Sequence, residues 1–412
     1  MEMKFNTQLL HGGNPPERSS GSTLPPIYQV SAFAQGSAEK LEKIFANKAH
    51  GYSYTRIGNP TVSAFEQRIN SLEGGAGAVA CSSGMAAVTM TLLNILSAGD
   101  ELIAGSALFG GTLDLFDDLR SFGINVVYSS EMTAEAIEPL ITDRTRAVFT
   151  ELVGNPRLDI ADIENISELL HSRSDPIPLI VDSTTATPYL VKPFEFGADI
   201  VIHSSSKYIN GSGDAISGII ADSGNFNWDP ERYSGFADYI CFGKFAFIAK
   251  LRGGIWRNSG ACLAPMNAFM NCIGLETLGL RMERLCENAL ALAEFFESRG
   301  VDVNYPALAS SPYHERCIKY LGGKGGAILT VRPGSKEKAY KLMNSLEYAL
   351  IATNIGDVRT LVIHPASTIY LHSDADKMHG AGVFEDTIRI SVGIEDKEDL
   401  IADFSQAIER IG

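Results

Sequence analysis

Short apolar runs alternate with amphipathic segments along most of the chain. The spacing of the apolar positions predicts helices over 61–74 and 84–99, with a short strand over 76–83 between them. Further strands are predicted at 100–105, 124–130, 146–152, 177–183 and 198–205, several of them separated by helical segments. This alternation predicts an α/β fold with a mostly parallel sheet covered by helices on both faces. Such sheets bind ligands at the carboxyl ends of their strands.

The pattern changes on both sides of this region. Residues 1–60 are irregular, with five prolines and one predicted short helix near 37–47, and we interpret them as an extended arm. Residues 222–260 are again less regular and are expected to be an insertion that shapes the site. A long helical stretch over 267–300 then leads into fewer strands and more helix. We therefore predict an arm at 1–60, a ligand-binding domain at 61–262 and a smaller α+β domain at 263–412.

Composition narrows the classes of function. The 412 residues carry a formal net charge of −15, with no cluster of lysine or arginine, which argues against nucleic acid or an anionic membrane as partner. The six cysteines and eight histidines show no metal-ligand spacing, so we expect no metal site. With no signal-peptide pattern and no apolar run of about 18 residues, the sequence is expected to be a soluble cytoplasmic protein.

Two of the predicted strands end in residues suited to catalysis. The run IPLIVDST ends at Asp182, and ADIVIHSSSK ends at Lys207. Because the carboxyl ends of parallel strands form the ligand-binding edge, an acid and a nucleophilic amine could meet there. A plain salt bridge, or two separately solvated charges, is an equally good interpretation of this pair alone.

Several neighbouring residues could hold an anion. Ser204 and Ser206 flank the lysine, and the backbone N–H groups of Gly84 and Met85 open a predicted helix. In the arm, YSYTRIGNPT offers the Tyr54 hydroxyl and the Arg56 guanidinium, which suits phosphate. A lysine for a Schiff base, an aspartate for a ring nitrogen and a phosphate cradle together fit pyridoxal 5′-phosphate.

The sequence resembles the cysteine/methionine-metabolism family of pyridoxal-phosphate enzymes. The matching stretches run in family order over nearly the whole chain: YSYTRIGNPT, SSGMAA, FGGT, GNP, VDST, HSSSKYINGSG, HPAST and IRISVGIED. The resemblance implies an aminotransferase-like (type I) fold and a homotetramer built as a dimer of dimers. It also implies that the arm contributes to the neighbouring subunit's site.

The resemblance assigns roles to individual residues. It implies that Lys207 holds the cofactor as a Schiff base and carries protons, and that Asp182 pairs with the pyridinium nitrogen. The expected phosphate ligands are Gly84, Met85, Ser204 and Ser206, completed by Tyr54 and Arg56 from the neighbouring subunit. Asn155 is expected to bind the cofactor's phenolic oxygen. Arg389, helped by Asn354, is expected to bind the substrate carboxylate.

Two positions depart from the usual family pattern. Phe109 stands where most members have a tyrosine that stacks on the cofactor ring and assists proton transfer. Phenylalanine can stack but has no hydroxyl, so Tyr54 or Lys207 is the expected proton carrier. A phenylalanine there resembles some homoserine-ester sulfhydrylases. Asn354 stands where many members have serine.

Within the family, the stretches around 150–166, 193–228 and 243–284 resemble the O-acetylhomoserine sulfhydrylase branch. This implies γ-replacement on O-acetylhomoserine by sulfide, giving homocysteine and acetate in methionine biosynthesis. A thiol or a sulfur-carrier protein is an alternative donor. Methionine γ-lyase and cystathionine γ-synthase are the alternative activities on the same scaffold.

Two interpretations from other classes remain open. The run GGAGAVA at 74–80 fits a dinucleotide-binding pattern, but it follows a helix and leads into a strand, the reverse of the usual context. The second interpretation is a non-catalytic scaffold protein, although the presence of Lys207 and Asp182 argues against it. GGKGG at 322–326 lacks the phosphate-loop spacing and is expected to be a turn.

Overall fold

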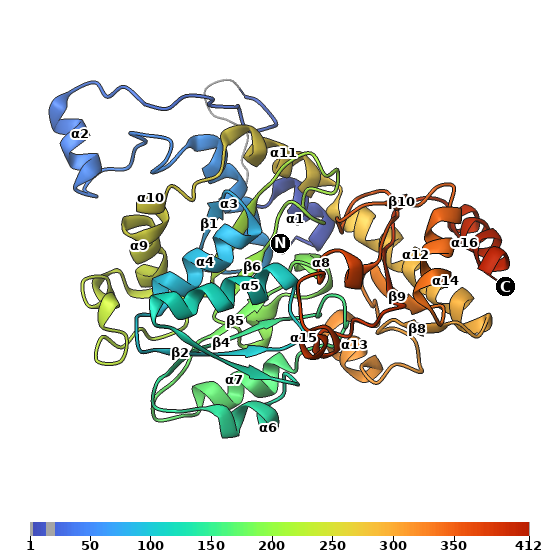
Figure 1. The fold of residues 1–412 in the computed structure, drawn as a ribbon. Helices are drawn as coiled ribbons and strands as arrows, with labels where there is room; N and C mark the ends of the chain where they lie inside the picture. The colour runs from blue at the N-terminus through green and yellow to red at the C-terminus, as the bar shows by residue number, and fades with distance from the viewer. Residues whose placement is uncertain (1–2, 14–20, 412) are drawn as a thin grey trace.

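The computed structural model describes residues 3–13 and 21–411 and contains two sheets (Figure 1). The strands of the larger sheet are, in spatial order, β1 (Gly77–Cys81), β7 (Gly218–Asp222), β6 (Ile200–His203), β5 (Leu179–Asp182), β4 (Thr145–Glu151), β2 (Glu101–Gly105) and β3 (Asn125–Ser129). Every pair from β6 to β3 is parallel, and β7 runs antiparallel to both β6 and β1. The predicted α/β class with a mostly parallel sheet is confirmed.

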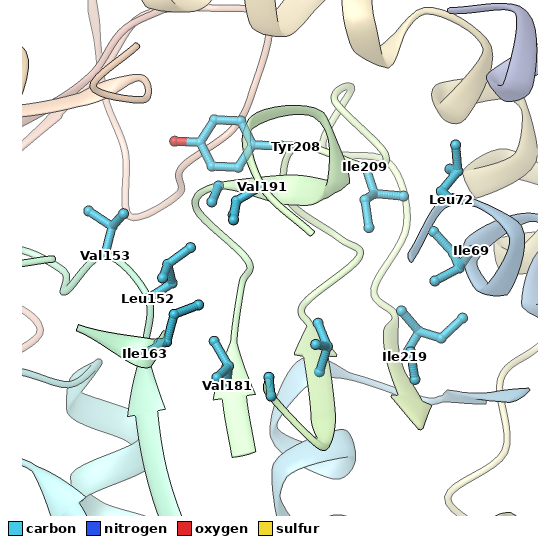
Figure 2. Packing of buried hydrophobic residues seen from close by; sticks show 14 of the residues in the cluster. Ile69, Leu72, Leu152, Val153, Ile163, Val181, Val191, Tyr208, Ile209 and Ile219 are labelled. Carbon is cyan, nitrogen blue, oxygen red and sulfur yellow. The ribbon is translucent and has the colours of Figure 1, made fainter. Parts of the chain in front are cut away.

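Alternate residues of these strands face two separate hydrophobic clusters, because successive side chains of a strand point to opposite faces. Val181 and Ile219 pack in one cluster with Ile69 and Leu72 from the helix before β1 (Figure 2). Ile180 packs in the other cluster, on the opposite face. The sheet is therefore buried on both sides, which explains why its strands are continuous apolar runs.

Helices cover both faces of the large sheet. The first cluster receives side chains from α1 (Phe5–His11), α3 (Pro60–Glu73), α7 (Ile163–His171), α11 (Pro265–Glu276) and α12 (Leu278–Ser298). The second receives them from α4 (Gly84–Ile95), α5 (Gly110–Leu119), α9 (Ala246–Gly253) and α10 (Ile255–Ser259). Shorter helices between strands are α6 (Ala134–Ile137) and α8 (Thr187–Leu190). The 3-10 turns are η1 (Arg120–Phe122), η2 (Glu138–Leu140), η3 (Pro193–Phe196), η4 (Ser234–Phe236), η5 (Ile240–Phe245) and η6 (Pro365–Ser367).

The arm has two parts with different packing. Helix α1 packs against α3, α11 and α12, and Leu9 is buried. Helix α2 (Ala38–Phe45), which confirms the short helix predicted there, has no buried residue and extends away from the rest of the chain (Figure 1). The arm around α2 thus makes few contacts with the rest of its own chain.

The smaller part is built on a five-stranded sheet, as the predicted α+β character requires. Its strands are, in spatial order, β10 (Leu350–Ile351), β11 (Leu361–Ile363), β12 (Ile388–Ser391), β9 (Ile328–Arg332) and β8 (Asp302–Asn304). Its helices are α13 (His314–Leu321), α14 (Lys336–Ser345), α15 (Ala375–Gly380) and α16 (Lys397–Ile411). Helix α12 joins the two parts, with Met282 in the first cluster and Phe296 in the core of the smaller sheet. The domain boundaries after residues 60 and 262 stay predictions.

Two local predictions need correction, and one strand of the large sheet was not predicted. The helical stretch over 267–300 is broken at Thr277, which separates α11 from α12. Strand β7 was not predicted, because its five residues follow a glycine- and serine-rich loop. Residues 222–260 were expected to shape the site, but none of them lines the cavity described below; α9 instead packs on α4 and β1.

None of the described helices combines the length and apolar character that crossing a bilayer requires. Among the described residues, no group of three or more histidine, cysteine and acidic side chains is placed to hold a metal ion.

Candidate active site

A cavity of about 550 Å³ lies where the carboxyl ends of the parallel strands face the smaller part of the chain. Strands β4, β5 and β6 end at its floor, and residues between 353 and 389 close the other side. Nine of the predicted site residues line it: Gly84, Met85, Phe109, Asn155, Asp182, Ser204, Lys207, Asn354 and Arg389. Residues far apart in the sequence therefore meet at the edge that the strand pattern predicted.

Lys207 lies in the turn that follows β6 and is mostly buried. Its Nζ donates a hydrogen bond to Asn354 Oδ1 at 2.6 Å, so a residue of the smaller part holds the amine. Burial, with a smaller contribution from the charge of Arg389, lowers the pKa of Lys207 to about 8. The amine is therefore partly neutral near neutral pH, as a nucleophile needs to be.

Arg389 on β12 is a buried cation with a free donor. It is 3% exposed; its Nη1 donates to Asn155 Oδ1 at 3.3 Å and its Nη2 to the Asn354 carbonyl at 3.2 Å. Its Nε is buried and has no hydrogen-bond partner among the described residues. Burial also lowers the pKa of Arg389 to about 10. A buried guanidinium with an unused donor at a cavity wall suits a carboxylate ligand.

Two carboxyl groups stand side by side at the ends of adjacent strands. Glu151 of β4 is the register partner of Asp182 of β5, and both line the cavity. Asp182 Oδ1 accepts the N–H and the hydroxyl of Thr184, at 2.9 and 2.5 Å. Glu151 Oε1 accepts the N–H of Phe109 at 2.6 Å.

The pKa values of both carboxyl groups are raised. Burial raises the pKa of Asp182, and the Thr184 hydrogen bonds oppose that rise. Burial and then the charge of Asp182 hold the pKa of Glu151 well above its usual range. The charge of Asp182 therefore favours the proton on Glu151, while the Thr184 donors favour the ionised form of Asp182.

Sequence reasoning missed Glu151. The signal was present, since Glu151 is the last residue of an apolar strand, as Asp182 is. The family resemblance gives a role to Asn155, four residues later, and none to Glu151.

The start of α4 forms a cradle for an anion. The N–H groups of Gly84 and Met85 open the helix and lack intrahelical acceptors, while the Ser83 side chain caps Ala86 at 3.0 Å. A Cβ added at Gly84 would lie 2.6 Å from Ser204 Cβ, so only glycine lets the helix approach the turn before Lys207 this closely. Backbone donors and the Ser204 hydroxyl thus meet at one corner of the cavity.

Three predicted residues do not line this cavity. Ser206 Oγ donates to the Ser217 carbonyl at 2.9 Å and accepts the Ser217 N–H at 3.1 Å, so it ties the turn to the strand that follows. Tyr54 is 43% exposed on the arm. Arg56 Nη1 donates to the Arg257 carbonyl at 2.8 Å. The roles predicted for Ser206, Tyr54 and Arg56 stay predictions.

Comparison with known families shows which family the chain belongs to. The model of the family described as "Cys/Met metabolism PLP-dependent enzyme" matches residues 6–409. The chain belongs to this family. Its cofactor is accordingly pyridoxal phosphate, and the predicted resemblance is confirmed.

Several relatives of this chain are named sulfhydrylases. A protein named sulfhydrylase FUB7 from Fusarium oxysporum f. sp. lycopersici is 39% identical, over 98% of this chain and 97% of that protein. O-acetyl-L-homoserine sulfhydrylase 1 of Thermus thermophilus is also 39% identical, over 98% of this chain and all of that protein.

A solved structure shows the same fold. It is that of a putative O-acetylhomoserine (thiol)-lyase from Campylobacter jejuni, with a TM-score of 0.92 and 34% identity, covering 99% of this chain and 100% of that one. A lysine of that protein carries a pyridoxyl phosphate group. The predicted type I pyridoxal-phosphate fold is thereby confirmed.

The residues of the cavity fit this cofactor. The cofactor needs an amine for its aldehyde, a carboxyl for its ring nitrogen and a cradle of donors for its phosphate. The cavity offers the mostly buried amine of Lys207, the carboxyl of Asp182 at a strand end, and the helix start closed by Gly84. The Nε of Arg389 has no partner among the described residues and remains available to an anionic ligand.

Proposed function

We propose that this enzyme catalyses γ-replacement on O-acetylhomoserine, in which sulfide or a thiol displaces acetate and sulfide gives homocysteine. The observation that carries the proposal is the full-length similarity to O-acetylhomoserine sulfhydrylases combined with a cavity that holds an amine, a carboxylate and a free arginine donor. The reaction balances, because O-acetylhomoserine and hydrogen sulfide give homocysteine and acetic acid.

We propose the following roles for the cavity residues. Lys207 would hold pyridoxal phosphate covalently, Asp182 would bind its ring nitrogen, Asn155 its phenolic oxygen, and Gly84, Met85, Ser204 and Ser206 its phosphate. When bound, pyridoxal phosphate supplies an electron sink for negative charge at the substrate carbons. Phe109 offers a ring for stacking but no proton.

The amine of Lys207 would therefore carry the protons. Arg389 would orient the substrate carboxylate, which places the substrate α-carbon towards Lys207. Lys207 Nζ would take the proton from the α-carbon and move protons at the β-carbon while acetate leaves the γ-carbon. Its low pKa suits both directions of transfer, since the neutral amine accepts a proton and the ammonium returns it.

We propose that a second copy of the chain completes the site. Tyr54 and Arg56 lie on an arm that does not reach the cavity of its own chain, and α2 has no buried residue. The arm and its flanks expose large apolar side chains, namely Ile27, Tyr28, Val30, Leu41 and Phe45. In a dimer, Tyr54 and Arg56 of one subunit would reach the phosphate end of the other subunit's site. A dimer of dimers is the predicted final assembly.

The activity is tested with purified holoenzyme and a panel of substrates. We expect homocysteine from O-acetylhomoserine plus sulfide at a kcat/KM at least about tenfold above that with the succinyl or phosphoryl ester. Dominant release of α-ketobutyrate and methanethiol from methionine would show a methionine γ-lyase instead. Dominant formation of cystathionine from cysteine would show a cystathionine γ-synthase. Replacing sulfide by a thiocarboxylated carrier protein tests the alternative sulfur donor.

Replacing Arg389 with lysine is expected to weaken substrate binding selectively. Lysine keeps the charge but loses the planar donor set, so we expect KM for the amino-acid substrate to rise about 10- to 100-fold, with a smaller change in kcat. Steady-state kinetics with the amino-acid substrate varied measures this. Arg332→Lys on the neighbouring strand β9, where the side chain pairs with Asp386, is the matched control. Equal KM values for both variants would contradict the proposal that Arg389 binds the substrate carboxylate.

Replacing Gly84 with alanine is expected to weaken cofactor binding. The new Cβ would press on Ser204, and the resulting shift at the cradle should raise the Kd for pyridoxal phosphate about 10- to 100-fold. Titration of cofactor-free protein by fluorescence measures this. Gly380→Ala is the control, because a Cβ there meets nothing within 4 Å. Unchanged affinity in Gly84→Ala would place the phosphate elsewhere.

The low pKa of Lys207 predicts how cofactor capture depends on pH. Only the neutral amine attacks an aldehyde, so the rate of covalent capture by cofactor-free protein should rise with pH and level off above about pH 8. An ordinary lysine would show the rise about two units higher. Stopped-flow absorbance at several pH values follows the capture. A rate that still climbs steeply between pH 9 and 10 would contradict the lowered pKa.

A further inference from the structure

Two cysteines outside the catalytic cavity face each other across a short antiparallel bridge. Cys81 ends β1, and Cys262 lies between α10 and α11; the two residues are bridge partners. The Ser82 N–H donates to the Ala261 carbonyl at 2.9 Å, joining the residue after one cysteine to the residue before the other. This bond makes the cysteines a non-hydrogen-bonded pair.

That register suits a disulfide. In a non-hydrogen-bonded antiparallel pair, the Cα atoms are about 4.5 Å apart and the side chains lie on the same face. Disulfides span Cα separations of about 4.4–6.8 Å, so no movement of the two backbone segments is required. Both side chains pack in the same hydrophobic cluster, which agrees with a shared face.

The two thiols differ in access. Cys81 is fully buried, whereas Cys262 is only half-buried. Burial raises the pKa of both thiols, and for Cys262 a backbone hydrogen bond and then the positive charge of Arg56 partly offset the rise. Cys262 is therefore the one that a small oxidant reaches first, and Cys81 is the one that resolves it.

We propose that Cys81 and Cys262 form a reversible redox pair that closes to a disulfide when a peroxide oxidises the protein. The Cys262 thiolate attacks one peroxide oxygen, and the O–O bond breaks. The other oxygen takes up a proton and leaves as water, and Cys262 becomes a sulfenic acid. The Cys81 sulfur then attacks that sulfur, the S–O bond breaks, and a second water leaves. Two thiols are oxidised and one peroxide is reduced to two waters; a thiol reductant reverses the bond.

The bond would join the two segments beside the anion cradle. Cys81 stands three residues before Gly84, and Arg56 donates to the carbonyl of Arg257, just before the segment of Cys262. The closed loop spans most of the large part of the chain, and a cross-link over so long a loop restricts the unfolded chain. We expect the oxidised protein to melt a few degrees above the reduced protein.

The experiment treats holoenzyme with dilute hydrogen peroxide and maps peptides without reduction. The expected result is a peptide joining Cys81 to Cys262 that disappears with dithiothreitol, together with the rise in Tm. Cys262→Ser should lose both, while Cys241→Ser, which removes an exposed cysteine, should keep both. Recovery of Cys81 and Cys262 as free thiols while Cys241 is oxidised would overturn the proposal. A cross-link between the buried Cys286 and Cys317 in its place would also overturn it.

A second variant covers the case in which Cys262→Ser does not fold. In Cys81→Ala the resolving thiol is missing, so Cys262 should stop at the sulfenic acid, which dimedone labels. Labelling of Cys262 in this variant and not in the wild type supports the pair. Equal labelling in both proteins would show that Cys81 does not resolve Cys262.

Discussion

Lys207→Ala is expected to lower kcat at least about 10³-fold and to end covalent attachment of the cofactor. The variant removes both the amine that would anchor pyridoxal phosphate and the proton carrier at the substrate α-carbon, and Phe109 cannot replace it because phenylalanine has no ionisable group. Borohydride reduction followed by mass spectrometry should show the pyridoxyl mass on Lys207 of the wild type and none on the variant. Added pyridoxal phosphate should still bind, because the helix cradle is intact.

The matched control is Lys250→Met. Burial lowers the pKa of Lys250 to about 8, as for Lys207, but Lys250 lies on α9 and does not line the cavity. We expect this variant to keep its turnover and its covalent cofactor. A Lys207→Ala protein with wild-type turnover, or a pyridoxyl group found on Lys250, would contradict the assignment of the anchor.

The floor of the site could be predicted because it depends on one rule of α/β folds. Parallel strands present their carboxyl ends at a single edge, so chemistry-bearing residues at the ends of separate apolar runs are brought together there. Asp182 and Lys207 both follow this rule, and so does Glu151, which the sequence analysis did not predict. Strand ends are therefore informative even when no motif is recognised.

The rest of the site depends on packing between distant parts of the chain. Arg389 lies on an otherwise ordinary strand, and only the packing of the smaller part on the larger one brings it against Asn155, while its other partner, the Asn354 carbonyl, belongs to the smaller part itself. The break at Thr277 was not predicted because apolar positions continue on both sides of it, although Gly274 and Gly279 flank it. The proposed role of Tyr54 and Arg56 is harder still to predict from the sequence, because it needs a second copy of the chain.

The pair of acids at the floor leads to the second large expected effect. Asp182→Asn should lower kcat about 10²–10³-fold, because the amide cannot hold a positive charge on the ring nitrogen. Glu151→Gln should cost less than about tenfold, because Glu151 already tends to be neutral and the glutamine oxygen can still accept the Phe109 N–H. Both substitutions preserve shape, so the difference reports charge.

The comparison of these two variants decides which carboxyl is the counter-ion. The pKa of each acid is raised by burial, but the donors of Thr184 favour the ionised form of Asp182, and the charge of Asp182 then favours the proton on Glu151. Steady-state kinetics and the absorbance of the bound cofactor across pH should change strongly in Asp182→Asn and little in Glu151→Gln. If Glu151→Gln had the larger effect and Asp182→Asn the smaller one, Glu151 would be the partner of the ring nitrogen and Asp182 the protonated acid.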